Sequence, residues 1–391
     1  MNFQVRPHVR AAGRQLPFEC VALLLQGGGA LGAYQGGIYE ALAEADIHPD
    51  WIAGISIGAI NAAILAGNPP NSRVDRLREF WTHVTTSAPW DWPGNPFLGF
   101  AKGDDTRNLL NQMSASFAAA CGATGFFSAR AALPWLQPGG TREATSFYDT
   151  KDLKRTLERL VDFDRLNAGI TRFSAGAVNV RTGNFVYFDT STHKIGPEHV
   201  MASGALPPGF PAVEIDGEHY WDGGLVSNTP LQWVIESNPR RQDMLAFQVD
   251  LWSSQGTLPR NLAEVATRLK EIQFSSRTRA STAQFKNVHR VQRALAALLR
   301  RLPADVEGND DLDILKSVES DKVYNIIHLI YRARNYEGHS KDYEFSRLSM
   351  QDHWRAGYHD AVRTLRHPEV LARSTSLDGV FTFDLERDGR E

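Results

Sequence analysis

Short apolar runs that lead into glycine or serine alternate with helical segments along residues 20–67. Cys20–Gln26 is a largely apolar run followed by three glycines, which predicts a buried parallel strand. The next segment repeats its apolar residues at helical spacing, with Ile38 and Leu42 on one side. Asp50–Ser56 predicts a second strand, and the small-residue segment Ile57–Gly67 predicts a second helix. This order of elements predicts an α/β fold of three layers, with a mostly parallel central sheet between helices.

Residues 84–147 interrupt this alternation and are rich in aromatic residues and proline. Helices are expected next to the aromatic part, near Arg73–Val84 and near Thr106–Cys121. Either an apolar cap over the sheet or the ordinary packing of an irregular segment explains this composition. The aromatic candidates for the walls of a cap are Trp90, Trp92, Phe97, Phe100, Phe126, Phe127 and Trp135.

The strand and helix signals return after this insertion. Leucines spaced four and three residues apart predict one helix over Tyr148–Leu166. Two β-type runs on either side of Arg181-Thr182-Gly183 predict a hairpin. Met244–Trp252 predicts another buried strand, after which the α/β core, taken to span residues 18–255, is expected to close.

The ends of the chain differ in composition from this core. Residues 1–17 contain several arginines and no long apolar run, which indicates a flexible tail. Residues 256–391 are expected to form an α-rich extension packed on the core, with a strand candidate at Lys322–Arg332 and a later helix capped by Ser349. The sequence of this extension assigns no chemistry to it.

Two glycine-containing motifs follow the first two predicted strands. Gly27–Gly32 fits G-x-G-x-x-G, a loop that gathers backbone N–H groups around an anion at a helix start. Gly54–Gly58 fits G-x-S-x-G between a predicted strand and a predicted helix, which is the setting of a nucleophilic serine. A dinucleotide-binding fold needs an acidic residue at the end of the second strand, where this chain has Ser56. The glycine loop is therefore expected to stabilise an oxyanion that forms when Ser56 attacks a substrate.

A nucleophilic serine needs a base, and none of the twelve histidines lies in an obvious local motif. His219 is three residues before Asp222, so the two side chains would point to opposite faces of a strand. Asp222 itself is followed by two glycines in a tight turn that would expose its carboxylate. An ordinary Asp-Gly turn between strands is the alternative interpretation.

The three motifs together resemble those of the patatin-like phospholipases. The order is a triple-glycine loop, G-x-S-x-G and then D-G-G, and the segment Met201–Leu231 resembles the family segment that contains D-G-G. The resemblance covers residues 20–250 and implies a Ser–Asp dyad that hydrolyses fatty-acyl esters through an acyl-enzyme, without a metal or another cofactor. By position it implies Ser56 as nucleophile, Asp222 as base, Gly27, Gly28, Gly29 and Gly32 as the oxyanion hole, and Gly54, Gly58, Gly223 and Gly224 as supporting glycines.

Leu31 departs from the family pattern, because members commonly have Arg or Lys at this position. Without that cation, neutral esters as well as phospholipids are possible substrates. The oxyanion hole uses backbone N–H groups, so it does not depend on this side chain. The expected substrate is therefore a lipid or another acyl ester, for a phospholipase A, a lysophospholipase or a neutral-ester lipase. Asp222 is expected to be partly buried, so that it stays ionised and yet basic.

Three other functions are considered. An esterase of the α/β-hydrolase type would take its base from a histidine after Asp222, and the candidates are His289, His328, His339, His353, His359 and His367. A membrane-surface scaffold on an inactive hydrolase fold is the non-enzymatic alternative. A nucleotide-binding oxidoreductase is disfavoured by the missing acidic residue described above.

The charge distribution bears on possible partners. The chain of 391 residues has a formal net charge of −3, which gives no reason to expect binding to nucleic acid. Arg260–Arg301 nevertheless holds ten Lys or Arg and two Glu, a net charge of +8. Within it, Val291–Arg301 predicts a basic amphipathic helix, which suits either an anionic membrane surface or a solvated position on the core. The sequence gives no oligomeric state.

The remaining sequence features concern the compartment. Cys20 and Cys121 are the two cysteines, too few for a disulfide framework, and they suit a reducing compartment. The N-terminal residues show no signal peptide, and no apolar run reaches the roughly 18 residues that span a bilayer. A cytoplasmic location is expected, with or without peripheral attachment to a membrane.

Overall fold

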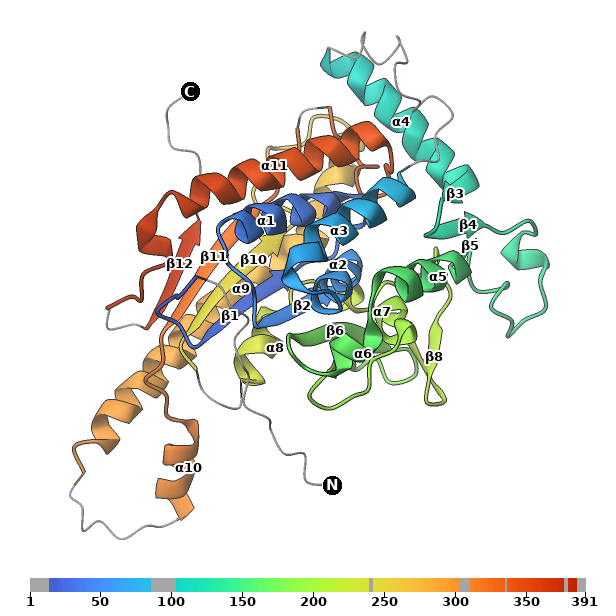
Figure 1. The fold of residues 1–391 in the computed structure, drawn as a ribbon. Coiled ribbons are helices and arrows are strands. Elements are labelled where there is room, and N and C mark those ends of the chain that lie inside the picture. Colours follow the sequence, from blue (N-terminus) through green and yellow to red (C-terminus); the bar gives the residue numbers. More distant parts are fainter. Residues whose placement is uncertain are drawn as a thin grey trace.

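A mixed central sheet organises the computed structural model, which describes residues 14–85, 103–238, 242–302, 310–334, 336–375 and 379–384. In these residues the sheet has nine strands, in the order β12-β11-β10-β1-β2-β6-β9-β8 with β7 paired to β6 (Figure 1). The strands are β1 (Cys20–Leu25), β2 (Trp51–Ile55), β6 (Arg172–Asn179), β7 (Phe185–Asp189), β8 (Val213–Ile215), β9 (Glu218–Asp222), β10 (Met244–Asp250), β11 (Tyr324–Ile330) and β12 (Val380–Asp384).

The central part of this sheet is parallel, and its strands are buried on both faces. β1 pairs in parallel with β10 and β2, β2 with β6, and β10 with β11, while β7, β8 and β9 run antiparallel to their neighbours. Every residue of β1 and β10 is buried, as the continuous apolar runs predict. The predicted α/β architecture with a mostly parallel sheet is confirmed.

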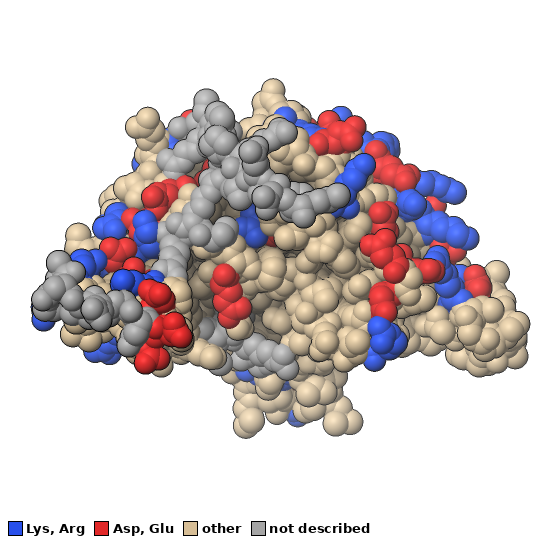
Figure 2. All heavy atoms as spheres, turned by 90° about the horizontal axis from the view of Figure 1, so that it is seen from below, with Lys and Arg blue, Asp and Glu red and all other residues tan. Residues whose placement is uncertain are grey.

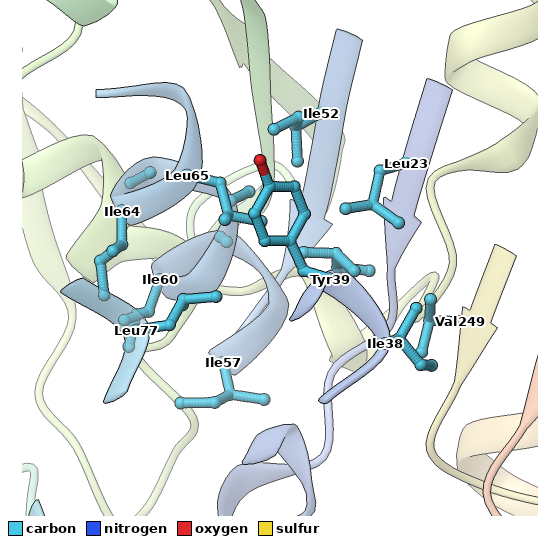
Figure 3. Close-up of a cluster of buried hydrophobic side chains, with 14 of the residues drawn as sticks. Leu23, Ile38, Tyr39, Ile52, Ile57, Ile60, Ile64, Leu65, Leu77 and Val249 are labelled. Carbon is cyan, nitrogen blue, oxygen red and sulfur yellow. The ribbon is translucent and has the colours of Figure 1, made fainter. Parts of the chain in front are cut away.

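Helices cover both faces of the sheet and give the fold three layers. On one face lie α1 (Ala33–Glu44), α2 (Ile57–Ala66), α3 (Pro70–Val84) and α11 (Arg347–Leu365), and on the other α8 (Leu231–Glu236) and α9 (Leu262–Leu299) (Figure 1). Leu23 of β1 faces the first layer, where it packs in one cluster with Ile38 and Ile60 (Figure 3). Leu24 faces the second layer and packs with Val234 of α8. The alternation of neighbouring residues between two apolar cores is what fixes the strand register.

The insertion forms a helix and a small separate sheet that project from the main body (Figure 1). Helix α4 (Asp104–Cys121) leads into β3 (Gly122–Ala123), β4 (Phe127–Ala129) and β5 (Tyr148–Asp149), which form an antiparallel sheet. The helices predicted near Arg73–Val84 and Thr106–Cys121 are confirmed as α3 and α4.

The single helix predicted over Tyr148–Leu166 is wrong at its start and in its continuity. Tyr148 belongs to β5, and the helical part divides into α5 (Lys151–Leu160) and α6 (Phe163–Asn167). The break lies at Asp162, whose side chain caps the second helix by accepting the N–H of Arg165 at 2.9 Å. Leu153, Leu157 and Leu160 are buried, as their spacing predicts. The hairpin around residues 181–183 is confirmed as β6 and β7.

The expectation that the α/β core closes near residue 255 is wrong. β11 and β12 extend the same sheet in parallel beyond β10, and β11 confirms the strand candidate at Lys322–Arg332. The long helices described in this region are α9, α10 (Asp310–Val318) and α11, with irregular segments between them. The last helix begins earlier than expected, because Ser346 rather than Ser349 provides its cap. Within the ranges that the structure describes, no helix is long and apolar enough to cross a membrane.

Candidate active site

Ser56 lies on a sharp turn between β2 and α2. Its φ is 56°, a left-handed value that a residue with a side chain seldom adopts, and it caps the N-terminus of α2. The two motif glycines permit this turn. A Cβ on Gly54 would lie 2.2 Å from the main-chain oxygen of Gly58, and a Cβ on Gly58 would lie 2.2 Å from that of Leu25. The strand and helix predicted around G-x-S-x-G are therefore present, and they place Ser56 at the carboxyl edge of the sheet.

Asp222 is the last residue of β9, and its side chain adjoins that of Ser56 in the lining of one cavity. The N–H of Gly224 donates to its Oδ1 at 2.7 Å, so the two glycines of D-G-G shape the turn around it. Asp222 is only 2% exposed, so the expectation of partial burial is wrong. Burial raises the pKa of this carboxyl to about 7, although the nearby hydroxyl of Ser56 and the N–H of Gly224 lower it. The carboxylate is thus more basic than an exposed one and close to the serine hydroxyl.

The triple-glycine loop follows β1 and adjoins Ser56. Gly27 is bonded through both of its backbone groups to Asn228, with the N–H donating at 3.1 Å and the carbonyl accepting at 3.0 Å. Gly28 and Gly29 have no acceptor for their N–H groups in the part of the chain that the structure describes. Gly32 lies away from the cavity, where a Cβ would meet Ile57 and Trp81. Of the four glycines, Gly28 and Gly29 therefore carry the donors that are free to meet an oxyanion.

Two further polar residues hold this arrangement, although sequence reasoning gave them no role. Asn228 fixes Gly27 as described, and Ser203 of α7 (Pro197–Ser203) accepts the N–H of Ser56 at 3.0 Å. The hydroxyl of Ser203 donates in turn to the carbonyl of Gly176 at 2.6 Å. Both lie in the segment Met201–Leu231 whose resemblance to the family was noted. The resemblance was thus the available signal, because neither residue fits a local pattern that assigns it to a site.

Ser56 and Asp222 open into a cavity of about 420 Å³ with mostly apolar walls. Its apolar and aromatic lining consists of Ile57, Ile60, Ala119, Phe126, Phe127, Tyr148, Leu206, Pro207, Pro208, Phe210, Trp252, Phe274, Tyr343 and Phe345. Of the expected cap residues, Phe126 and Phe127 line the cavity, while Trp135 is 68% exposed and does not. Trp90, Trp92, Phe97 and Phe100 lie outside the described residues. Phe274, Tyr343 and Phe345 belong to the region for which no chemistry was expected.

The histidines required by a Ser–Asp–His triad are not at this site. None of the six candidates after Asp222 is among the residues that line the cavity. His353 pairs with Glu337 and His289 with the carbonyl of Lys322, so both are engaged elsewhere. Leu31, at the position where the family has a cation, is fully buried in the core and is also absent from the lining. In the described ranges, no group of three His, Cys, Asp or Glu side chains is placed to hold a metal ion.

Family models match both halves of the chain. The model described as patatin-like phospholipase matches residues 23–235, and one described as patatin phospholipase matches residues 272–377. Among curated proteins, the patatin-like phospholipase domain-containing protein 7 of Rattus norvegicus is 42% identical over 74 residues, 19% of this chain and 6% of that protein. Its Mus musculus counterpart is 40% identical over 74 residues, with the same coverage. The match thus spans a small fraction of the length of these relatives.

Two solved structures are also similar to this chain. VipD from Legionella pneumophila has a TM-score of 0.39 and 15% identity, covering 93% of this chain and 72% of VipD. The complex of full-length SpcU with full-length ExoU from the type III secretion system of Pseudomonas aeruginosa has a TM-score of 0.26 and 15% identity. It covers 76% of this chain and 67% of the matched chain. Scores this low support no conclusion about the site.

Proposed function

Because the chain belongs to the patatin-like phospholipase family, we propose that it is a lipid acyl hydrolase in which Ser56 and Asp222 form the catalytic dyad. The observation that carries this proposal is the adjacency of the two side chains in the lining of one apolar cavity. The strained backbone of Ser56 and the raised pKa of Asp222 support it, since both are common at catalytic centres.

In the first half of the proposed reaction, Ser56 attacks the carbonyl carbon of the ester. As its oxygen forms the bond to carbon, its proton passes to ionised Asp222, and the carbonyl oxygen takes the negative charge. The free N–H groups of Gly28 and Gly29 donate to this oxyanion. When the intermediate collapses, the bond to the alcohol oxygen breaks, and that oxygen takes the proton from Asp222. The acyl group is left on Ser56.

In the second half, water attacks the acyl carbon and gives its proton to Asp222. The same N–H groups stabilise the second oxyanion. Collapse breaks the bond between the acyl carbon and Ser56, whose oxygen recovers the proton from Asp222. The fatty acid is released and the dyad returns to its starting state. Because Asp222 is ionised only above its pKa, which is raised to about 7, the dyad is suited to neutral and mildly alkaline pH.

The composition of the cavity bears on the substrate. Its apolar walls suit an acyl chain, and its charged lining residues in the described chain are Asp222 and Asp342, with no Lys or Arg. An anionic head group close to the scissile bond would therefore find no cation in this lining. We propose that neutral acyl esters are accepted at least as well as phospholipids.

Attachment to an anionic membrane through Arg260–Arg301 is a second part of this proposal. Among the described residues, at least six of the ten cations are engaged within the chain: Arg260 with Glu264, Arg268 with Glu271, Lys270 with Asp342, Lys286 with Thr382, Arg293 with main-chain carbonyls and Arg300 with Asp321. The face drawn in Figure 2 shows basic and acidic side chains interspersed along its edges. The free thiols of Cys20 and Cys121 are consistent with the proposed cytoplasmic location.

A panel of esters tests the activity. Acylglycerols, phosphatidylcholine, lysophosphatidylcholine and p-nitrophenyl esters of varied chain length are incubated with the wild type and with Ser56→Ala. We expect the wild type to release fatty acid and the variant to lose this activity. If the alanine variant hydrolyses every ester as well as the wild type, the proposed function is wrong.

A further inference from the structure

The glycine loop touches a segment that lies more than 300 residues later in the chain. The N–H of Ala30, the residue after the free donors, donates to the main-chain oxygen of Asp342 at 2.8 Å. The two backbones approach so closely that a Cβ on Gly29 would lie 2.0 Å from the same oxygen. The backbone of Asp342 therefore constrains the conformation of the loop at Gly29 and Ala30.

Asp342 is itself held from α9. Lys270 donates to its two carboxylate oxygens at 2.8 and 2.9 Å and to the carbonyl of His339 at 3.2 Å. The neighbouring Lys341 donates to Glu271 at 2.7 Å and is 5% exposed. Two ion pairs thus hold the segment to α9, at Lys341 and at Asp342. A partly buried ion pair resists displacement more than an ion pair on the surface does.

A second contact reaches Ala30 from α11. His353 is 2% exposed, and its Nε2 lies 2.9 Å from Oε1 of Glu337, which also accepts the hydroxyl of Tyr331 at 2.7 Å. Burial lowers the pKa of His353, but Glu337, Glu344 and the backbone of Ala30 raise it above its ordinary value. The Nδ1 atom is buried without a partner of ordinary hydrogen-bond geometry in the described chain. The backbone of Ala30 nevertheless lies near this ring.

We propose that the segment Glu337–His353 is a positioning element of the active site, which holds Ala30 from both sides and so keeps the N–H groups of Gly28 and Gly29 directed at the oxyanion. The carbonyl of Asp342 accepts the N–H of Ala30, and the buried ring of His353 lies near the backbone of the same residue. The inference rests on the proposed function, because the donors have a role only if an oxyanion forms. It assigns a function to the C-terminal region, whose sequence gave none.

The same segment also forms one wall of the cavity. Asp342, Tyr343 and Phe345 line it together with Phe274 of α9, and the ring of Phe345 packs against those of Phe126 and Phe127 from the insertion. One short stretch therefore contacts both the donors and the place where the acyl chain is expected. A loss of positioning should appear in kcat, since the donors act on the transition state, whereas a change in the wall alone should appear in KM.

The first test removes the ion pair behind Asp342. Lys270→Met keeps most of the aliphatic stem and breaks the pair, and Lys286→Met is the matched control. Lys286 is a half-buried lysine of the same helix, bonded to Thr382 away from the cavity. For a short soluble p-nitrophenyl ester, we expect Lys270→Met to lower kcat about tenfold with KM little changed, less than the 10²–10³ that loss of a donor costs. Lys270→Arg should restore most of the activity, and Lys286→Met should stay within about twofold of the wild type.

The second test addresses His353. His353→Gln is compared with His289→Gln, a substitution of another buried histidine that bonds a main-chain carbonyl far from the loop. Both should lower the melting temperature, but only His353→Gln should lower kcat and slow the labelling of Ser56 by a fluorophosphonate. If both positioning variants match their controls while the wild type is active, this inference is wrong and the proposed function stands. If the wild type neither hydrolyses esters nor reacts with the probe, both fail.

Discussion

Asn228 is hydrogen-bonded to both backbone groups of Gly27, with its side-chain oxygen 3.1 Å from the nitrogen and its side-chain nitrogen 3.0 Å from the oxygen. The indole nitrogen of Trp252 donates to the same carbonyl at 2.9 Å. These bonds fix the residue that precedes the two free donors. The side chain of Asn228 thus lies between the glycine loop and Gly224, the last residue of the D-G-G turn.

Asn228→Ala should therefore lower kcat about tenfold, because it frees the loop while leaving the donors of Gly28 and Gly29 in place. A matched control exists in Asn167, which makes the same pair of bonds to the backbone of Ile195 at 2.7 and 2.8 Å. Asn167→Ala should cost similar stability in a thermal melt without lowering kcat. Equal losses of kcat in the two variants would contradict a specific role of Asn228.

The pH dependence of activity should follow Asp222. Below its pKa of about 7 the carboxyl is protonated and cannot take the proton of Ser56, so kcat/KM should rise as the pH passes through about 7. The measurement is a profile of kcat/KM on a neutral ester between roughly pH 5 and pH 9. A profile that is flat across pH 6 to 8, or that falls there, would contradict Asp222 as the base.

The burial of Asp222 also predicts that the folded protein loses stability as the pH rises. The folded pKa of Asp222 is raised above the ordinary value of 3.8, so its contribution to stability is present below that value and is lost as the pH rises towards about 7. The neutral isostere in Asp222→Asn avoids this loss. We expect this variant to melt at a higher temperature than the wild type at pH 8 and to lose its activity. An unchanged or lower melting temperature at pH 8 would contradict the shifted pKa.

The preference of the enzyme for acyl-chain length should depend on the residues at the rim of the cavity. Ala119 of α4 lines the cavity and is exposed, so Ala119→Phe narrows the rim without disturbing the core. We expect the variant to raise KM for long-chain p-nitrophenyl esters while short esters are unaffected. Ala120→Phe, at an exposed neighbour outside the lining, is the control. An equal effect on all chain lengths would argue against an acyl chain at this rim.

Attachment to membranes has its own test, in which vesicles are sedimented at low and high salt. If the basic segment binds anionic lipid, sedimentation should fall when the salt rises from about 0.05 M to about 0.5 M, since screening shortens the reach of exposed charges. At low salt, Arg301→Glu should bind these vesicles more weakly than the wild type. Arg301 is exposed, and its side chain has no acidic partner among the described residues. Binding that changes neither with salt concentration nor with lipid charge would contradict an electrostatic mechanism.

Much of the fold and of the site's chemistry could be predicted because it depends on short local patterns. The buried strands before Gly27 and Ser56 follow from continuous apolar runs, and the turn at Ser56 follows from glycines that must pass within van der Waals contact of a backbone. The position of Asp222 beside Ser56 could be anticipated only through the resemblance, because it depends on β9 pairing with β6, which pairs with β2.

The parts that could not be predicted depend on contacts between distant segments. The full burial of Asp222, the bond of Gly27 to Asn228 and that of Ala30 to Asp342 all join residues far apart in sequence. β11 and β12 join the sheet beyond β10 through pairings between segments that are far apart in sequence, so the sheet was expected to close too early. Individual residue types do not encode such pairings.

The most direct test of the central claim is the covalent labelling of Ser56. The wild type, Ser56→Ala and Asp222→Asn are incubated with a fluorophosphonate, and the adduct is located by intact mass and peptide mapping while ester hydrolysis is followed in parallel. The account predicts a single adduct on Ser56 of the wild type, none on Ser56→Ala, and slow labelling with loss of hydrolysis in Asp222→Asn. An adduct on another residue, or hydrolysis that survives both substitutions, would contradict it.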